Sequence, residues 1–201
     1  MKSPDEHPAD HTWRLIYYAF RNDLKSTSTL PVNARAMQTE SLIATPYAQS
    51  TATVRPEWID NNGHMNVGFY HVAFDQASDS FFEWIGLTPE VRQKHFSSTF
   101  ALESHLHFHR EVKEGDRLRF EARLLNADEK RIHFYQEMFH ADEGYLAATY
   151  ESLSLHMNMK IRRSAAMPPE LLARTQAVLA AHRALPRPWQ IGHVIGEKPP
   201  K

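Results

Sequence analysis

The 201-residue sequence contains no cysteine, no long apolar run and no excess of charge of either sign. Without cysteine, the chain can form neither a disulfide framework nor a thiolate nucleophile nor a thiolate metal site. No apolar run approaches the ~20 residues that cross a bilayer, so we expect no membrane span. The formal net charge of −1 provides no field that would favour nucleic acid or an anionic membrane.

The N-terminal heptapeptide MKSPDEH is acidic and contains proline, so it lacks the basic and apolar regions of a signal peptide. We therefore expect a cytoplasmic protein. The apolar fraction of 42% is enough for one core, and 201 residues fit one domain with appended termini. Helical spacing predicts a short helix at residues 13–24, within a linker rich in serine and threonine. Met37 offers a second start, so residues 1–36 either belong to the functional protein or extend it.

The regular pattern begins after residue 50. From Val67 to Ile85, apolar residues recur at spacings of three, four and seven, which predicts one long helix. Four strands joined by hairpin turns are predicted at residues 99–112, 117–125, 131–140 and 145–157, after a strand-prone run at 51–55. A second helix is predicted from Pro168 to about Arg183, before a proline-rich end that is expected to be extended and mobile.

These elements predict an α+β layer structure, in which one long helix lies on an antiparallel sheet of about five strands. We divide the chain into a flexible N-terminal extension (1–50), a main domain (51–160), and a C-terminal helix with its tail (161–201). The first strand of the meander alternates cleanly between two faces. One face carries Glu103, His105, His107 and His109, and the other carries Leu102, Ser104, Leu106 and Phe108.

Seven residues between the first strand-prone run and the long helix combine several reactive groups, Asp60-Asn61-Asn62-Gly63-His64-Met65-Asn66. A helix N-terminus exposes unpaired N–H groups and partial positive charge, which can hold an oxyanion or a polarised carbonyl. A carboxylate and an imidazole at such a point suit acyl transfer. Asp60 could instead cap the helix, but it stands about six residues ahead of the helix body. Asn66 is the better N-cap, with a substrate hydrogen bond as its alternative role.

The order of strand, Asp-x-x-Gly-His-x-Asn motif, long helix and four-strand meander resembles the hot-dog fold thioesterases of the 4-hydroxybenzoyl-CoA thioesterase-like superfamily. The resemblance covers residues 51–157 and includes the helix start Val67-Gly68-Phe69-Tyr70. More narrowly, the segments Glu57-Trp58-Ile59, Glu103-Ser104-His105 and Lys130-Arg131-Ile132-His133-Phe134 are similar to the thioesterases of carnitine breakdown that act on betainyl-CoA. The resemblance implies a hot-dog fold, an acyl-CoA substrate, no cofactor, and a homodimer or homotetramer.

The resemblance also implies catalytic roles for Asp60 and His64. The aspartate either attacks the thioester carbonyl or activates a water, and the sequence leaves both routes open. Gly63 permits a backbone conformation closed to other residues. The N–H groups from Met65 to Phe69 would then face the thioester oxygen. His64 would orient the aspartate, donate to the carbonyl or protonate the leaving thiolate; alternatively, it ties the turn to the sheet.

The remaining candidates concern substrate binding. Trp58, Phe69 and Tyr70 are either core aromatics or a cage that would attract a betainyl quaternary ammonium. Glu103 and His105 would line the site if a neighbouring subunit's sheet contributes to it. The histidine row that includes His105 also suggests a zinc site, because alternate strand residues share a face and imidazoles bind zinc. Because the sequence offers no complementary cluster, a polar sheet face or subunit contact explains the row better, and no metal is expected.

Two other functions stay open at this point. A hydratase or dehydratase of the same fold would use an aspartate and a histidine for proton transfer and would leave the thioester intact. A non-catalytic acyl-CoA binding protein would need the fold without the chemistry. Release of free thiol from acyl-CoA substrates separates both alternatives from a thioesterase.

Overall fold

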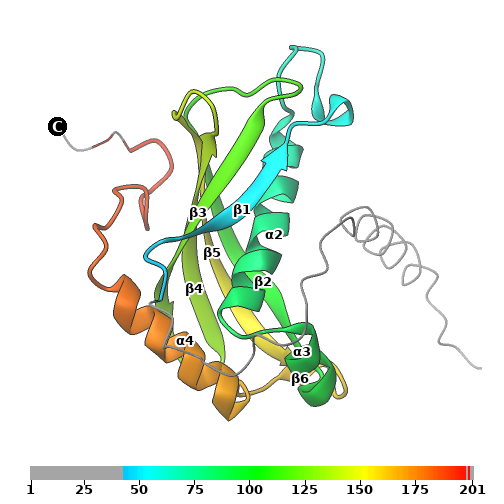
Figure 1. Cartoon of the computed structure of the whole chain (residues 1–201), viewed down its shortest axis with the longest axis vertical. Helices are drawn as coiled ribbons and strands as arrows, with labels where there is room; N and C mark the ends of the chain where they lie inside the picture. Colours follow the sequence, from blue (N-terminus) through cyan, green and yellow to red (C-terminus); the bar gives the residue numbers. More distant parts are fainter. Residues whose placement is uncertain (1–42, 198, 200–201) are drawn as a thin grey trace, which may run out of the picture. The chain divides into compact units, whose positions relative to one another are not determined.

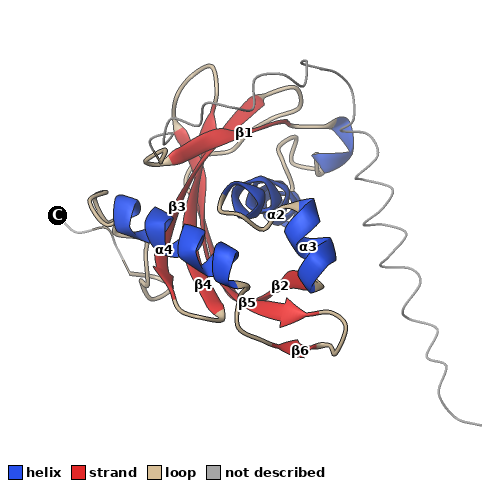
Figure 2. Ribbon diagram, turned by 60° about the horizontal axis from the view of Figure 1, so that its bottom comes forward, coloured by secondary structure: helices blue, strands red, loops and turns tan. Residues whose placement is uncertain are grey.

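The computed structural model describes residues 43–197 and residue 199. The helix predicted at 13–24 and most of the predicted extension lie outside these described residues. Within them, one antiparallel sheet curls around a long helix, α2 (Val67–Trp84), as Figures 1 and 2 show. This arrangement confirms the predicted α+β hot-dog fold. None of the helices described is long and apolar enough to cross a membrane.

The sheet has the strand order β1-β3-β4-β5-β2, and a short strand, β6, pairs with β5. All pairs are antiparallel, so β3, β4 and β5 form successive hairpins while β1 and β2 occupy the outer positions of this order. The strands are β1 (Tyr47–Thr53), β2 (Ser97–Phe108), β3 (Arg117–Ala127), β4 (Arg131–His140), β5 (Leu146–Asn158) and β6 (Arg163–Ser164).

Helix α2 lies against the inner face of the sheet because its apolar residues form one broad face. Phe74 is buried at the centre of this contact. Its ring stacks on Tyr150 of β5 at 5.3 Å and meets the edge of Phe120 of β3 at 5.7 Å. Burying one such side chain stabilises the fold by about 1.5–3 kcal/mol. The helix ends at Trp84, one residue before the predicted end, and Gly86 turns the chain with φ of +112°.

Helix α3 (Pro89–His95) lies between α2 and β2 and has no counterpart among the predicted elements. Thr88 is its N-cap, and the hydroxyl oxygen of this residue accepts from the N–H of Val91 at 3.4 Å. Pro89 opens the helix, where its missing N–H needs no partner. With seven residues, α3 is too short for an apolar period to show in the sequence.

Helix α4 (Pro169–His182) packs against β3 on the outer face of the sheet, opposite α2 (Figure 2), and matches the predicted C-terminal helix. His182 fixes the end of α4 and is only 3% exposed. Its Nδ1 accepts from the N–H of Leu124 at 2.9 Å, and its Nε2 donates to the carbonyl of Ala44 at 2.8 Å. These two bonds tie the helix to β3 and to the segment that precedes β1.

Strand β2 keeps the predicted alternation along most of its length. Leu106 lies opposite Tyr150 and so faces α2, whereas His105 lies opposite Glu151 and faces outward. A register shift between Ala101 and Glu103 interrupts the alternation at Leu102, which pairs with no residue of β5 and is 55% exposed. The predicted place of Leu102 on the inner face is therefore wrong, because a bulge adds one residue to this strand.

The chain end differs from the mobile tail that we predict from its prolines. The segment 186–197, which we call the C-terminal strap, returns across the outer face of the sheet. Gln190 and Ile191 are buried there, at 7% and 6% exposure. The N–H of Gly192 donates to Glu151 of β5 at 2.7 Å. The strap is thus held by contacts with distant strands, which proline content alone does not reveal.

Candidate active site

The loop between the short 3-10 helix η1 (Pro56–Trp58) and α2 carries the motif and is closed by its own backbone. The N–H of Asp60 donates to the carbonyl of His64 at 3.1 Å, and the N–H of Gly63 donates back to the carbonyl of Asp60 at 3.0 Å. Gly63 adopts φ of +78°, a left-handed conformation that is strained for other residues. Ile59 and Met65 bridge the base of the loop. In Figure 1 the loop is drawn in cyan above the start of α2.

Asp60 and His64 lie side by side in this loop. One Asp60 oxygen, Oδ1, accepts from the N–H of Asn62 at 2.8 Å and is 4.0 Å from Nδ1 of His64. The side chains of Asp60 and His64 are 22% and 33% exposed, so both can meet a substrate. Nδ1 of His64 is 3.3 Å from the carbonyl of Met65, which fixes the proton on this nitrogen and leaves Nε2 as the acceptor of the neutral ring.

Five N–H groups, those of residues 65–69, are the candidates for contact with the thioester oxygen, and four of them already have acceptors. Met65 and Asn66 donate their N–H groups to neighbouring carbonyls at 2.9 and 2.8 Å. Gly68 and Phe69 donate to Asn66 itself, both at 2.9 Å. Within the described part of the chain, the N–H of Val67 has no acceptor, and Val67 is 61% exposed. The Val67 N–H is therefore the donor at the start of α2 that is available to stabilise an oxyanion.

Asn66 is the N-cap of α2, as the sequence predicts. Its side-chain oxygen accepts from the N–H of Gly68, and its backbone is extended, with φ of −64° and ψ of 143°. The cap thus occupies the Gly68 amide and leaves the Val67 amide open. Asp60 is outside the helix and makes its hydrogen bond within the loop, so the carboxylate is not used as a cap.

The aromatic residues near the motif divide into buried and accessible groups. Trp58 is 1% exposed, stacks on Phe69 at 5.8 Å, and has the guanidinium of Arg55 5.6 Å from its ring centroid. The ring of Trp58 therefore supports the loop from the core and is not open to a ligand in this chain. Tyr70 is also buried, and burial raises the pKa of its phenol. Its ring meets Phe108 of β2 edge-on at 5.1 Å.

Phe108 is the accessible member of this group, at 44% exposure, and we did not select it as a site residue. The signal was present, because its place in the β2 alternation assigns it to the same inner face as α2. His71 and Asp75 of α2 were also missed, although their i, i+4 spacing places them on one side of the helix. The ring of His71 meets Tyr150 edge-on at 5.4 Å. Desolvation by burial raises the pKa of the Asp75 carboxyl.

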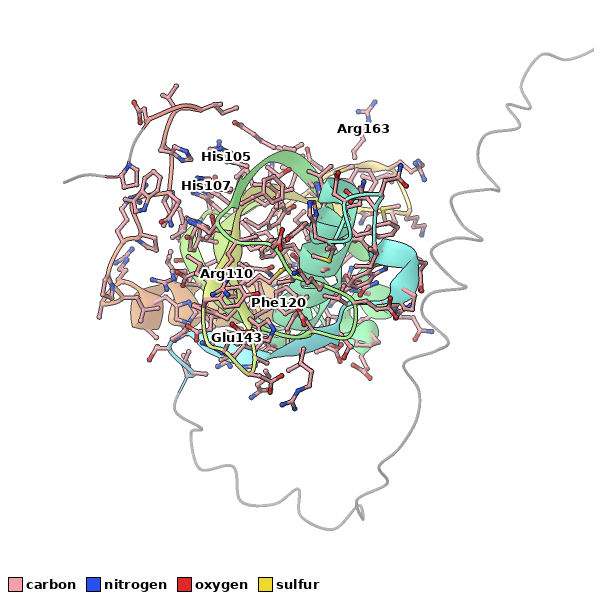
Figure 3. All side chains as sticks on the ribbon, turned by 90° about the horizontal axis from the view of Figure 1, so that it is seen from above. His105, His107, Arg110, Phe120, Glu143 and Arg163 are labelled. Atoms are coloured by element: carbon pink, nitrogen blue, oxygen red, sulfur yellow. The ribbon has the colours of Figure 1, made fainter. Side chains whose placement is uncertain are left out.

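Glu103 and His105 lie on the outer face of β2, away from α2, and in this chain they do not join the Asp60 loop. Figure 3 shows His105 and His107 beside the C-terminal strap. No three histidine or acidic side chains among the residues described are arranged to hold a metal ion. The histidine row therefore belongs to a different part of the molecule from the motif.

The comparisons with known proteins agree with this geometry. The family model described as the thioesterase-like superfamily matches residues 54–175. The chain belongs to this superfamily. The match begins before the Asp60 loop and extends into α4, so it includes the loop, α2 and the strands β2 to β5.

Sequence relatives give the same result at closer range. The chain is 42% identical over 146 residues to a betainyl-CoA thioesterase of Pseudomonas aeruginosa, with 73% of this chain and 92% of the relative covered. It is 34% identical over 146 residues to an L-carnitine dehydrogenase/betainyl-CoA thioesterase of Rhizobium meliloti. That match covers 72% of this chain and 29% of the longer relative.

Two solved structures share the fold over nearly their whole length. A Staphylococcus aureus protein in complex with CoA superposes with a TM-score of 0.70 at 28% identity, covering 79% of this chain and 99% of that one. A putative thioesterase of Pseudomonas putida superposes with a TM-score of 0.65 at 27% identity, covering 78% and 98%. Together with the family match, these findings confirm the predicted superfamily and acyl-CoA thioester hydrolysis as the class of activity.

Proposed function

We propose that the protein hydrolyses betainyl-CoA to the free acid and coenzyme A. The observation that carries this proposal is the 42% identity to the Pseudomonas aeruginosa betainyl-CoA thioesterase, which extends over 92% of that protein. The Asp60 loop supports it, because a partly exposed carboxylate and imidazole lie there beside the start of α2, where the Val67 amide is open.

Asp60 would supply the carboxylate of the reaction. Its Oδ1 is engaged by the Asn62 amide, so Oδ2 is the oxygen left to react. In one route, this oxygen adds to the thioester carbonyl and expels the CoA thiolate, and water then hydrolyses the mixed anhydride. In the other, the carboxylate takes a proton from a water that attacks the carbonyl. In both routes the carbonyl oxygen gains negative charge, which the Val67 N–H would stabilise.

His64 would act on the leaving group. With its proton on Nδ1 and bonded to the Met65 carbonyl, the neutral ring presents Nε2 as a base. A proton taken up at Nε2 can pass to the departing thiolate. The 4.0 Å separation from Asp60 Oδ1 also lets the protonated ring stabilise the carboxylate between turnovers.

A second copy of the chain would complete the site. Strand β2 ends the main strand order, and Phe100, Leu102 and Phe108 on it are 40%, 55% and 44% exposed. Pairing two β2 strands around a two-fold axis would cover these side chains and bring a neighbouring strand to the inner groove beside α2. We therefore propose a homodimer, or a tetramer of such dimers, as the active form.

A panel of acyl-CoA substrates tests the proposed function through release of free thiol. The deciding pair is betainyl-CoA and 3,3-dimethylbutyryl-CoA, which have the same shape and differ by the positive charge. Because one cation–π contact is worth about 0.5–2 kcal/mol, we expect kcat/KM to be about 2- to 30-fold higher for betainyl-CoA. Equal values for the two would remove the betainyl assignment. No thiol from any substrate, together with hydration of an enoyl-CoA, would identify the protein as a hydratase instead.

A further inference from the structure

A group of histidines lies on the outer face of the sheet, apart from the Asp60 loop. His105, His107 and His109 come from β2 and the residue just after it, and His193 comes from the C-terminal strap. We call these four residues the histidine cluster. The family match ends before the strap begins, and no step of the proposed reaction uses the cluster.

The rings of the cluster hold the strap directly. His193 stacks on His105 with ring centroids 4.5 Å apart and lies 5.3 Å from His107. Trp189 meets the edges of His107 and His193 at 5.2 and 5.1 Å. On the other side, His107 lies 4.4 Å from His109. The labelled rings of His105 and His107 can be followed beside the strap in Figure 3.

Hydrogen bonds fix the strap on both sides of these rings. The two oxygens of Glu151 are both engaged, one by Nε2 of His133 and one by the N–H of Gly192, each at 2.7 Å. The side chain of Arg123 donates to the carbonyl of Pro186 at 2.7 Å, where the strap begins. Glu151 therefore links the strap to both β4 and β5.

A cavity of about 500 Å³ adjoins the cluster, with Glu103, His105, Glu151, His193 and Ile195 among its walls. The cavity therefore reaches the rings of His105 and His193, which contact His107. Removing the strap would open this cavity along its whole length, because residues 192, 193 and 195 form one wall.

The surroundings of His107 and His109 favour their neutral rings. Burial lowers the pKa of His107, and the neighbouring His193 and His105 lower it further. Burial also lowers the pKa of His109, with a contribution from His107. Nδ1 of His107 is buried and finds no hydrogen-bond partner in the described part of the chain. The charged and titratable groups that face the cluster from the surrounding elements are Glu103 on β2, His133 on β4, Glu151 on β5 and Arg187 on the strap.

We propose that the C-terminal strap is a pH-gated cover of the outer sheet face, docked when His107 and His109 are neutral and released when they are protonated. A histidine with a lowered pKa in the docked state binds its proton more readily after release. Docking is therefore complete above the ordinary histidine pKa of about 6.5 and weakens as the pH falls below it. Release would open the cavity and uncover the outer face of β2, the strand whose Phe108 contacts Tyr70 of α2 on the inner face.

Hydrogen exchange of the intact protein tests this proposal. Between pH 7.5 and pH 5.5, after correction for intrinsic rates, protection of the amides at residues 190–193 should fall relative to the core amides of α2, because His107 and His109 each bind a proton more readily after release. The double variant His107→Gln/His109→Gln cannot gain these charges and should keep its protection at pH 5.5. The matched control His95→Gln, a histidine outside the cluster that pairs with Glu170, should lose protection as the parent does. Unchanged protection in the parent, or an equal loss in the double variant, would overturn the proposal.

A second measurement follows the strap of the parent protein and does not use the histidine variants. The emission of Trp189, taken as the difference between the parent and Trp189→Phe, should shift to longer wavelength over the same pH interval as water replaces the imidazole contacts. Constant emission of Trp189 from pH 7.5 to pH 5.5 would contradict release of the strap.

Discussion

Two polar groups on opposite sides of the sheet are held in different ways. On the inner side, the Asp60 loop is closed by backbone hydrogen bonds among residues 58–66 and by a glycine with positive φ. On the outer side, the C-terminal strap is held by rings and carboxylates that can change charge, His193 and Glu151 among them. The first group is closed mainly by main-chain atoms, whereas several contacts of the second involve side chains that can be protonated.

In the Asp60 loop, main-chain atoms set the geometry and the Asp60 side chain would supply the reacting group. A catalytic carboxylate must change its bonding during a reaction without moving the groups around it. At the Asp60 loop the side chain makes one backbone contact, and the turn itself is closed by main-chain atoms. Substitution of the side chain should therefore change activity and leave the fold, whereas substitutions in the cluster should change docking and leave catalysis.

The largest effect is expected for Asp60→Asn. The amide keeps an oxygen for the Asn62 N–H but is neither a nucleophile nor a base, so kcat should fall by at least about 10³-fold. Thiol release from betainyl-CoA measures this, and the melting temperature checks the fold. Asp142→Asn, which removes a surface carboxylate paired with Arg117, is the control and should retain activity. Unchanged turnover in Asp60→Asn would eliminate this residue as the catalyst.

The next effect concerns the backbone of the loop. Gly63→Ala and Gly144→Ala place a methyl group at φ of +78° and +76°, and neither methyl would meet an atom within 4 Å. Each should therefore lower the free energy of unfolding by about 1–2 kcal/mol through backbone strain alone. Only Gly63→Ala should also lower kcat/KM, by about tenfold or more, since it shifts the reacting groups. Equal kinetics for the two variants would show that the loop geometry does not matter for the reaction.

Much of this organisation is readable from the sequence because it is local. The period of α2, the β2 alternation from Glu103 to Phe108, and the Asn66 cap each depend on residues a few positions apart. The strap contacts depend on pairs such as His105 with His193, which are far apart in the chain, and no periodicity records them. The sequence does not reveal the bulge at Leu102 or the helix α3 for a related reason. A single extra residue in a strand, or a helix of only two turns, is too short to produce a recognisable apolar period.

The sequence places the residues of the Asp60 loop together, but it does not give the hydrogen bonds of the loop. The motif places Asp60, Gly63 and His64 together through spacing alone. The Val67 amide emerges only when every neighbouring donor has been assigned to an acceptor, which requires coordinates. Similarly, a flanking tryptophan can face a ligand or the core, and burial decides that Trp58 faces the core.

A histidine with a structural role on the outer face gives a pH effect on stability. Burial lowers the pKa of His182, and its Nδ1 must stay unprotonated because the Leu124 N–H donates to it. The unfolded chain therefore takes up this proton first, and stability is present above pH ~6.5 and declines as the pH falls below it. His182→Ala should lower the free energy of unfolding at pH 7.5 by about 1–3 kcal/mol, since the buried Leu124 N–H and the partly buried Ala44 carbonyl lose their partner.

Urea unfolding at pH 7.5 and pH 5.5 checks this prediction. The difference between the two free energies should be smaller in His182→Ala than in the parent. His71→Ala, which removes an exposed histidine of α2, serves as the control and should keep the parent's difference. If His182→Ala keeps the full difference, the pH dependence arises elsewhere.

The smallest effect is expected at Asn66, the N-cap of α2, which binds the Gly68 amide and leaves the Val67 amide open. Asn66→Ala removes the acceptor of the Gly68 N–H and should cost about 1 kcal/mol, as should Thr88→Ala at the start of α3. Loss of the α2 cap also frees the first turn that carries the Val67 amide, so kcat should fall severalfold in Asn66→Ala and not in Thr88→Ala. Asn66→Asp retains the acceptor and should restore both properties. Equal stability losses with no change in kcat would mean that the Val67 amide does not depend on the cap for its orientation.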